Sequence, residues 1–136
     1  MKYSLHEFLK AVVGIATASH AAGTVNGPAI DRVGFEEALV VVHSGTNGAG
    51  GTVDIKVQES DDNSTWADIS GAAFDQITEA NDNDIYVGRI NLKPRKKYIR
   101  VVATVGTAAC VFGAVIVLGA AIDLPVSQVN DVAFSV

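Results

Sequence analysis

The chain has 136 residues, of which 49% are hydrophobic and 18% charged, and its formal net charge is −5. This length is sufficient to bury the core of one domain without disulfides or metals. The acidic balance argues against a nucleic-acid partner, whose phosphates require a basic surface. So few charges cannot cover the whole surface, and we therefore expect part of the apolar surface to contact another chain.

Residues 1–22 are predicted to form an N-terminal arm that contains a short helix. Ser4 and Glu7 have the spacing of a capping box, in which each side chain satisfies a backbone donor of the other residue. Residues 11–19 that follow are small or β-branched and show no clear period. We expect this stretch to lie outside the main domain.

The next segments have the patterns of β-strands. Residues 52–59 place Val or Ile at every second position, which is the period of a half-buried strand. The apolar run 39–42 within residues 35–44 is unbroken and favours a strand that is covered on both faces. The glycine-rich stretch 45–51 between them predicts a hairpin with a flexible tip.

The second half of the chain continues this pattern. Residues 85–92 and 98–105 predict a second hairpin around a basic loop, residues 109–118 a last core strand, and residues 73–77 a short one. Seven or eight strands at such short intervals predict an all-β fold, an antiparallel β-sandwich or jelly roll over residues 23–122. Residues 123–136 form a C-terminal segment that is expected to lie across a neighbour as an arm.

One apolar stretch has the length of a membrane span. Residues 101–122 carry no charge and follow a cluster of basic residues. Gly106, Gly113 and Gly119 interrupt the stretch, and Val and Thr dominate it. We therefore interpret it as two strands joined by a turn at Gly106 and Thr107, and we expect no membrane partner.

No phosphate or metal motif is present in the sequence. The glycine-rich stretch 45–51 lacks the lysine of a phosphate-binding loop and enters a strand instead of a helix. The acidic turns 61–63 and 81–84 do not match the calcium-binding EF-hand loop, although Asp and Asn are common in turns between strands. His6, His20 and His43 show no metal-ligand spacing. We expect no metal and no cofactor.

Nucleophile motifs are missing as well. Ser44 and Ser64 lie outside any nucleophile-elbow pattern. Cys110 is the single cysteine, which excludes an internal disulfide, and its apolar neighbours predict a buried, inert thiol. We expect no catalytic residue, although a triad assembled from distant segments is the enzymatic alternative.

Two groups of residues are candidates for binding. The run Lys93–Lys97, with Arg89 and Arg100 nearby, is either a surface that docks on an acidic protein or a solvated hairpin loop. Trp66, which returns toward the predicted core, has a similar pair of interpretations. It either stacks on a glycan together with an aromatic neighbour, Tyr86 or Tyr98, or fills a core or interface.

Several short segments resemble a known family. Residues 57–66 (VQESDDNSTW), 88–90 (GRI) and 97–101 (KYIRV) are similar to a pattern found in small structural proteins of tailed-bacteriophage particles. Residues 27–32 (GPAIDR), which precede the valine-rich strand, also resemble it. The resemblance covers roughly residues 23–120, and head decoration proteins are the family it matches best.

The resemblance implies a non-enzymatic protein of the virion. Such a protein binds the major capsid protein on the outside of the expanded head and stabilises the shell, often as a homotrimer. Residues 1–22 are then expected to dock on the shell while the sandwich forms the trimer. The alternative is a collar, tail or fibre-associated sandwich that binds a carbohydrate or a receptor.

Overall fold

The structure, a computed structural model, describes residues 4–130 and 132–136. These residues contain one short helix, α1 (Leu5–Phe8), one 3-10 turn, η1 (Glu79–Asn81), and nine strands. The strands are β1 (Lys10–His20), β2 (Gly23–Asn26), β3 (Ile30–Asp31), β4 (Phe35–Asn47), β5 (Thr52–Ser60), β6 (Ala67–Ala73), β7 (Ile85–Asn91), β8 (Tyr98–Gly106) and β9 (Cys110–Ala121).

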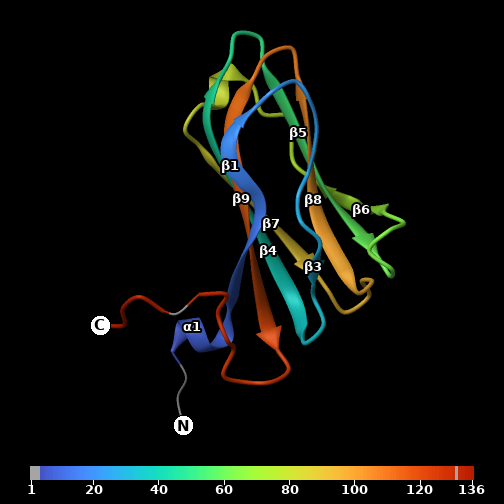
Figure 1. Cartoon of the computed structure of the whole chain (residues 1–136), viewed down its shortest axis with the longest axis vertical. Coiled ribbons are helices and arrows are strands. Elements are labelled where there is room, and N and C mark those ends of the chain that lie inside the picture. The colour runs from blue at the N-terminus through green and yellow to red at the C-terminus, as the bar shows by residue number, and fades with distance from the viewer. Residues whose placement is uncertain (1–3, 131) are drawn as a thin grey trace.

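The strands form an antiparallel β-sandwich of two sheets (Figure 1). Sheet A has the order β1–β9–β4–β7. Sheet B has the order β2–β8–β5–β6, and β3 also pairs with β8. The predicted all-β fold is therefore confirmed, as is the capping box that begins α1, in which the Ser4 N–H donates to Glu7 Oε2 at 2.6 Å.

The core lies between the two sheets and consists almost entirely of aliphatic side chains. The alternation in β5 turns Val53, Ile55 and Val57 inward, as predicted from the sequence. Val40 and Val42 of β4 point into the core from sheet A. Burial of such apolar surface is the main favourable contribution to folding.

Both predicted hairpins are corrected by the topology. β4 lies in sheet A and β5 in sheet B, and β7 and β8 are divided between the sheets in the same way. Each pair is joined by an arch, a loop that passes from sheet A to sheet B. An alternating pattern shows which side chains of a strand point inward, but it leaves open which strand is the partner.

The glycine-rich loop between β4 and β5 is closely packed, in contrast to the flexible tip expected from its sequence. A Cβ atom at Gly48 would lie 2.8 Å from the Cβ atom of Ala108, and one at Gly51 would lie 2.7 Å from Cys110 Sγ. β4 itself continues to Asn47. These glycines permit the arch to pack against the start of β9.

The N-terminal region also differs from the expectation. Residues 10–20 form β1, an edge strand of sheet A that pairs with β9 from Lys10 to His20. The sandwich therefore begins well before the predicted boundary at residue 23. Two register shifts, on either side of Ile15, interrupt β1, and they explain why its sequence shows no clear period.

The C-terminal segment begins on its own chain and then leaves it. The Val126 N–H donates to the Glu7 carbonyl at 2.8 Å, and Gln128 Nε2 donates to the His6 and Leu9 carbonyls at 2.7 and 2.5 Å. Beyond this anchor, the segment extends away from the sandwich (Figure 1). The prediction that it lies across a neighbour stays a prediction.

Three shorter segments complete the fold. Residues 101–122 form the end of β8, a turn and β9, and no helix of the described residues is long and apolar enough to cross a membrane. The strand expected at 73–77 does not form. Instead, β6 ends at Ala73, and Ile77 makes a single bridge to Val53. The run 39–42 is buried on its inner side alone, because Leu39 points outward and is exposed.

Candidate functional site

The acidic turns hold the protein's own backbone. Asp62 Oδ1 accepts hydrogen bonds from the Thr65 and Ser64 N–H groups at 2.8 and 2.9 Å and from the Ser60 hydroxyl at 2.9 Å. These bonds, the one from Thr65 first, lower the pKa of Asp62 to about 2. Within the described residues, no group of three or more His, Cys, Asp or Glu side chains has the geometry to hold a metal ion.

The second acidic turn is structural in the same sense. Asp82 Oδ1 accepts from the backbone N–H and the side-chain amide of Asn47 at 2.9 and 3.0 Å. The hydroxyl of buried Ser44 donates to the Asn81 carbonyl at 2.6 Å and accepts from the Asp84 N–H at 3.0 Å. These bonds fix the end of β4 to the chain that precedes β7.

The histidines and the cysteine are distributed over separate elements. His6 is on α1, His43 on β4, and His20 ends β1, where its ring packs against Phe112 with a centroid distance of 4.5 Å. Cys110 is fully buried at the start of β9, as predicted. His20 Nε2 bonds to the Ala16 carbonyl, Cys110 Sγ to the Ala108 carbonyl and the Ser44 hydroxyl to the Asn81 carbonyl, so each of these side chains has a backbone partner of its own.

Acidic partners neutralise most of the basic loop. The pairs, with their N–O distances, are Arg89–Glu37 (2.5 Å), Lys93–Glu36 (3.5 Å), Arg95–Glu59 (3.5 Å) and Lys96–Asp61 (3.9 Å). Most of these groups are exposed to solvent, which screens their attraction, so the pairs contribute little to stability. Their main effect is that the loop presents alternating charges rather than a basic patch.

The aromatic residues do not form the open platform considered from the sequence. Trp66 is half-buried on the outer side of sheet B, where the Arg100 guanidinium lies 4.3 Å from the centre of its ring. It therefore lies outside the core to which its position was expected to return it. Tyr86 belongs to sheet A and packs against the core, and Tyr98 has Lys97 Nζ 5.1 Å from its ring centre.

The outer face of sheet B is consequently polar and internally bonded. Asp68 accepts from Gln58 Nε2 at 2.8 Å and from Lys56 Nζ at 3.0 Å, and these two bonds, Gln58 first, lower its pKa. Arg100 donates to Gln58 Oε1 at 2.8 and 3.0 Å. This face satisfies its own polar groups and offers little apolar surface to a partner.

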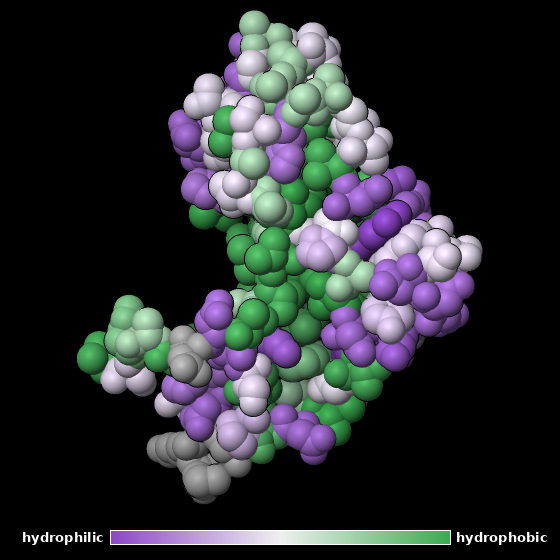
Figure 2. Space-filling view, viewed as in Figure 1, coloured by the Kyte–Doolittle hydropathy of each residue, from purple (hydrophilic) through white to green (hydrophobic). Residues whose placement is uncertain are grey.

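The outer face of sheet A is the opposite. Val13, Val115, Val41 and Val87 are register partners on β1, β9, β4 and β7, so they form one line across all four strands. We call these four residues the valine row. Val13, Val115 and Val87 are 56%, 44% and 58% exposed. Hydrophobic residues are also prominent at the middle of the surface in Figure 2, beside the projecting C-terminal segment.

Apolar neighbours widen the valine row into a patch. Ala11, Val117 and Leu39 form the next line of register partners, which ends at Arg89 on β7. Leu39 is exposed, and so is Ile85, which pairs with His43 on the other side of the row. A contiguous exposed apolar area of this kind is a candidate interaction site.

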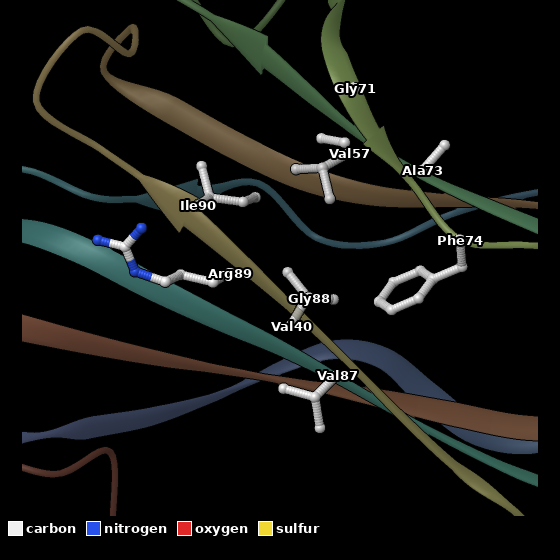
Figure 3. A pocket seen from close by; sticks show the side chains of 10 residues that line it. Val40, Val57, Gly71, Ala73, Phe74, Val87, Gly88, Arg89 and Ile90 are labelled. Atoms are coloured by element: carbon white, nitrogen blue, oxygen red, sulfur yellow. The ribbon is translucent and has the colours of Figure 1, made fainter.

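A second feature is a cleft of about 200 Å³ between β6 and β7, the facing edges of the two sheets. Its lining is mainly apolar. The ring of Phe74 points at Gly88, while the side chains of Val87 and Arg89 point away from this ring (Figure 3). A Cβ atom at Gly88 would be 3.1 Å from that ring. Among the residues that line the cleft, Arg89 has the one titratable side chain.

The candidate functional site is therefore the outer face of sheet A. The sequence contained part of its signal, because the unbroken run 39–42 indicated a strand with two covered faces. The other members of the valine row come from strands far apart in the chain. Only the register of sheet A brings Val13, Val87 and Val115 into line with Val41.

Comparisons with known proteins show the fold. No family model and no curated protein sequence matches the chain. Among solved structures, the PBSX exported protein XepA matches with a TM-score of 0.62 and 17% identity, over 93% of this chain and 43% of that one. The chain thus spans less than half the length of XepA.

Two further solved structures match less well. The SPBc2 prophage-derived protein YomS has a TM-score of 0.49 and 14% identity, over 82% of this chain and 91% of that one. A structure described as Bacillus endospore appendages, a family of disulfide-linked pili, has a TM-score of 0.37 and 14% identity, over 88% and 96%. Of the three, only XepA has a TM-score above 0.5, and at 17% identity that likeness concerns the fold alone.

Proposed function

We propose that this chain is a non-enzymatic structural protein of a phage particle, a decoration protein that binds the major capsid protein on the outside of the head. The observation that carries the proposal is the valine row, an apolar patch through which such a protein would form its trimer, on a domain whose polar groups bind one another. A patch of this kind is suited to permanent contacts between proteins. The sequence resemblance supplies the phage context, and the fold is shared with the PBSX exported protein XepA.

A decoration role also fits the energetics of a shell. A symmetric particle presents the same binding site many times, and subunits joined as a trimer engage several of these sites at once. Linked sites of modest affinity then give tight overall binding. Because β1 is part of the sandwich, the N-terminal contact with the shell is confined to the residues before Lys10, where Leu5 of α1 is exposed.

The proposal is tested with heads assembled without this protein. Purified wild-type protein should sediment with these heads and raise the temperature at which they release DNA. Leu5→Lys should weaken sedimentation, whereas Val33→Lys, at an exposed valine before β4, should not. Wild-type protein that stays in the supernatant would overturn the assignment to the head.

A carbohydrate- or receptor-binding protein of the collar, tail or fibre is the second candidate. The cleft between β6 and β7 favours it, because an apolar recess with Phe74 at its wall can hold a small ring. Binding on a glycan array, lost in Phe74→Ala and retained in Trp66→Ala, would support this candidate. An absence of binding, together with sedimentation on heads, would support the first one.

A further inference from the structure

Among the described residues, no segment of the chain itself covers the whole length of the valine row. The row crosses four strands, and neighbouring strands are about 4.8 Å apart, so it extends for about 14 Å. Its three most exposed members, Val13, Val115 and Val87, belong to three different strands. A suitable occupant is therefore a short, extended, uncharged segment with apolar side chains on one side.

Residues 132–136 (VAFSV) have these properties. Val132, Phe134 and Val136 alternate with Ala133 and Ser135, so an extended backbone would present all three large side chains on one side. Phe134 is 78% exposed in the structure. Five extended residues span about 13 Å from first to last Cα, which is close to the length of the row.

The segment also begins at the correct place. Gln128 accepts from the Ala11 N–H at 3.3 Å, which anchors the chain beside β1, the edge of sheet A. Val129 then lines a recess of about 240 Å³ together with Val13 and Val115. From there the chain turns away from its own sandwich, as the projecting segment in Figures 1 and 2 shows.

We propose that residues 132–136 of one copy cover the valine row of a second copy of this chain. Phe134 of the first copy would pack over the centre of the row, near Val115 and Val41 of the second. Exchange of the segment in both directions closes a dimer, and exchange around a ring closes a trimer. The proposal concerns self-association, which is one part of the proposed function, and does not depend on the identity of the particle.

The sequence supports a second chain as the occupant. The run 39–42 has the composition of a strand covered on both faces, but its own fold covers one of them. Sheet B provides the contrast, because Lys56, Gln58 and Asp68 make its outer face polar. Of the two outer faces, the one that carries the valine row is the one beside the exposed apolar segment.

Disulfide trapping tests the contact directly. Cys110 is fully buried, so a new cysteine on the surface reacts alone under mild oxidation. A mixture of Phe134→Cys and Val115→Cys proteins should give a linked pair of one chain of each kind. Phe134→Cys mixed with Val33→Cys, an exposed valine before β4 that is not part of the valine row, should give little. Equal yields from the two mixtures would overturn the proposal.

The origin of the segment needs its own control. A chain that carries both Phe134→Cys and Val115→Cys should give linked oligomers on a denaturing gel without reductant. A product with the mass of one chain would assign the segment to its own valine row and would overturn the proposal. Reversal of the pattern by reductant confirms that the bond is a disulfide.

Light scattering measures what the contact contributes. Wild-type protein should be oligomeric at micromolar concentration, and a chain without residues 132–136 should need a concentration about tenfold higher or more to associate. Val87→Lys combined with Val115→Lys should have the same effect, whereas Val33→Lys should not. A monomeric wild type would overturn the proposal. An oligomer that is lost with the lysines but kept without the segment would show that two valine rows pack on each other.

Sedimentation with heads separates this inference from the proposed function. If the segment is exchanged but the protein has another role, the trapped pair forms and no variant sediments with heads. If the protein decorates heads without exchange, wild type sediments and the trapped pair does not form. The two results are independent, so each proposal fails on its own measurement.

Discussion

Asp62 shows how a single residue can determine a turn and also make stability depend on pH. Its ordinary pKa is 3.8 and its pKa in the fold is about 2, because two backbone N–H groups and one hydroxyl donate to the carboxylate. The folded state therefore favours the charged form. The stabilisation is complete above about pH 4 and is lost as the pH falls toward 2.

We expect Asp62→Asn to lower the melting temperature most above pH 4, since it removes the charge but keeps the shape of the side chain. The difference from wild type should shrink as the pH falls from 4 to 2. Thermal melts followed by circular dichroism across this range measure it. Asp61→Asn removes one charge from the same loop and is the control, and a difference that is constant with pH for Asp62→Asn would contradict the explanation.

At the scale of elements, the sequence predicted strands better than their partners. The strict alternation of β5 follows from one inward and one outward face, and the structure confirms it. β4 and β5 were expected to form a hairpin, but their arch places them in different sheets. β1 was missed because its two register shifts, around Ile15, remove the period that identifies a strand.

The candidate site was predictable only in part for the same reason. An unbroken run such as 39–42 predicts two covered faces without saying what covers them. The valine row depends on cross-strand register between residues as distant as Val13 and Val115, and local patterns do not contain register. The basic loop shows the converse, since its acidic partners come from β4, β5 and the loop after β5.

A substitution pair in β1 tests whether this strand belongs to the sandwich. Ile15 is 2% exposed and packs in the core. Ile15→Ala should therefore lower the free energy of unfolding by roughly 2–5 kcal/mol, through lost burial and the cavity left behind. Urea denaturation measures the change. Val13→Ala, two residues earlier on the exposed face, should cost less than about 1 kcal/mol. Equal, small effects would place β1 outside the cooperative fold.

The anchor of the C-terminal segment can be tested in the same way. Gln128 is bonded to Ala11, His6 and Leu9, and thereby links the C-terminal segment to α1 and β1. Gln128→Ala should leave the melting temperature of the sandwich nearly unchanged but increase hydrogen exchange of the Ala11 amide and proteolysis after residue 122. Gln76→Ala, whose side chain bonds to Asp54 on the outer side of sheet B, is the matched control. Unchanged protection of Ala11 would show that the anchor does not hold in solution.

For the whole molecule, the important property is the difference between its two outer faces. Sheet B presents ion pairs and hydrogen bonds, such as Lys56–Asp68 at 3.0 Å, and sheet A presents the valine row. A sandwich with two polar faces is complete as a monomer. This one leaves the apolar area of the valine row uncovered on one outer face, so an assembly that covers this area must use the outer face of sheet A.

This difference predicts how self-association responds to salt. Attraction between exposed charges weakens as salt is added, because ions screen charges that are separated by more than a Debye length, which is about 10 Å at 0.1 M salt. Apolar contacts are not screened, and salts excluded from the protein surface, such as sulfate, strengthen them. We therefore expect the mass measured by light scattering to stay constant or rise as sodium sulfate is added. Lys93→Gln, which removes one cation of the basic loop, should not change this result. Dissociation on addition of salt would instead assign the contact to the basic loop and the acidic residues around it, and would leave the valine row without a role in assembly.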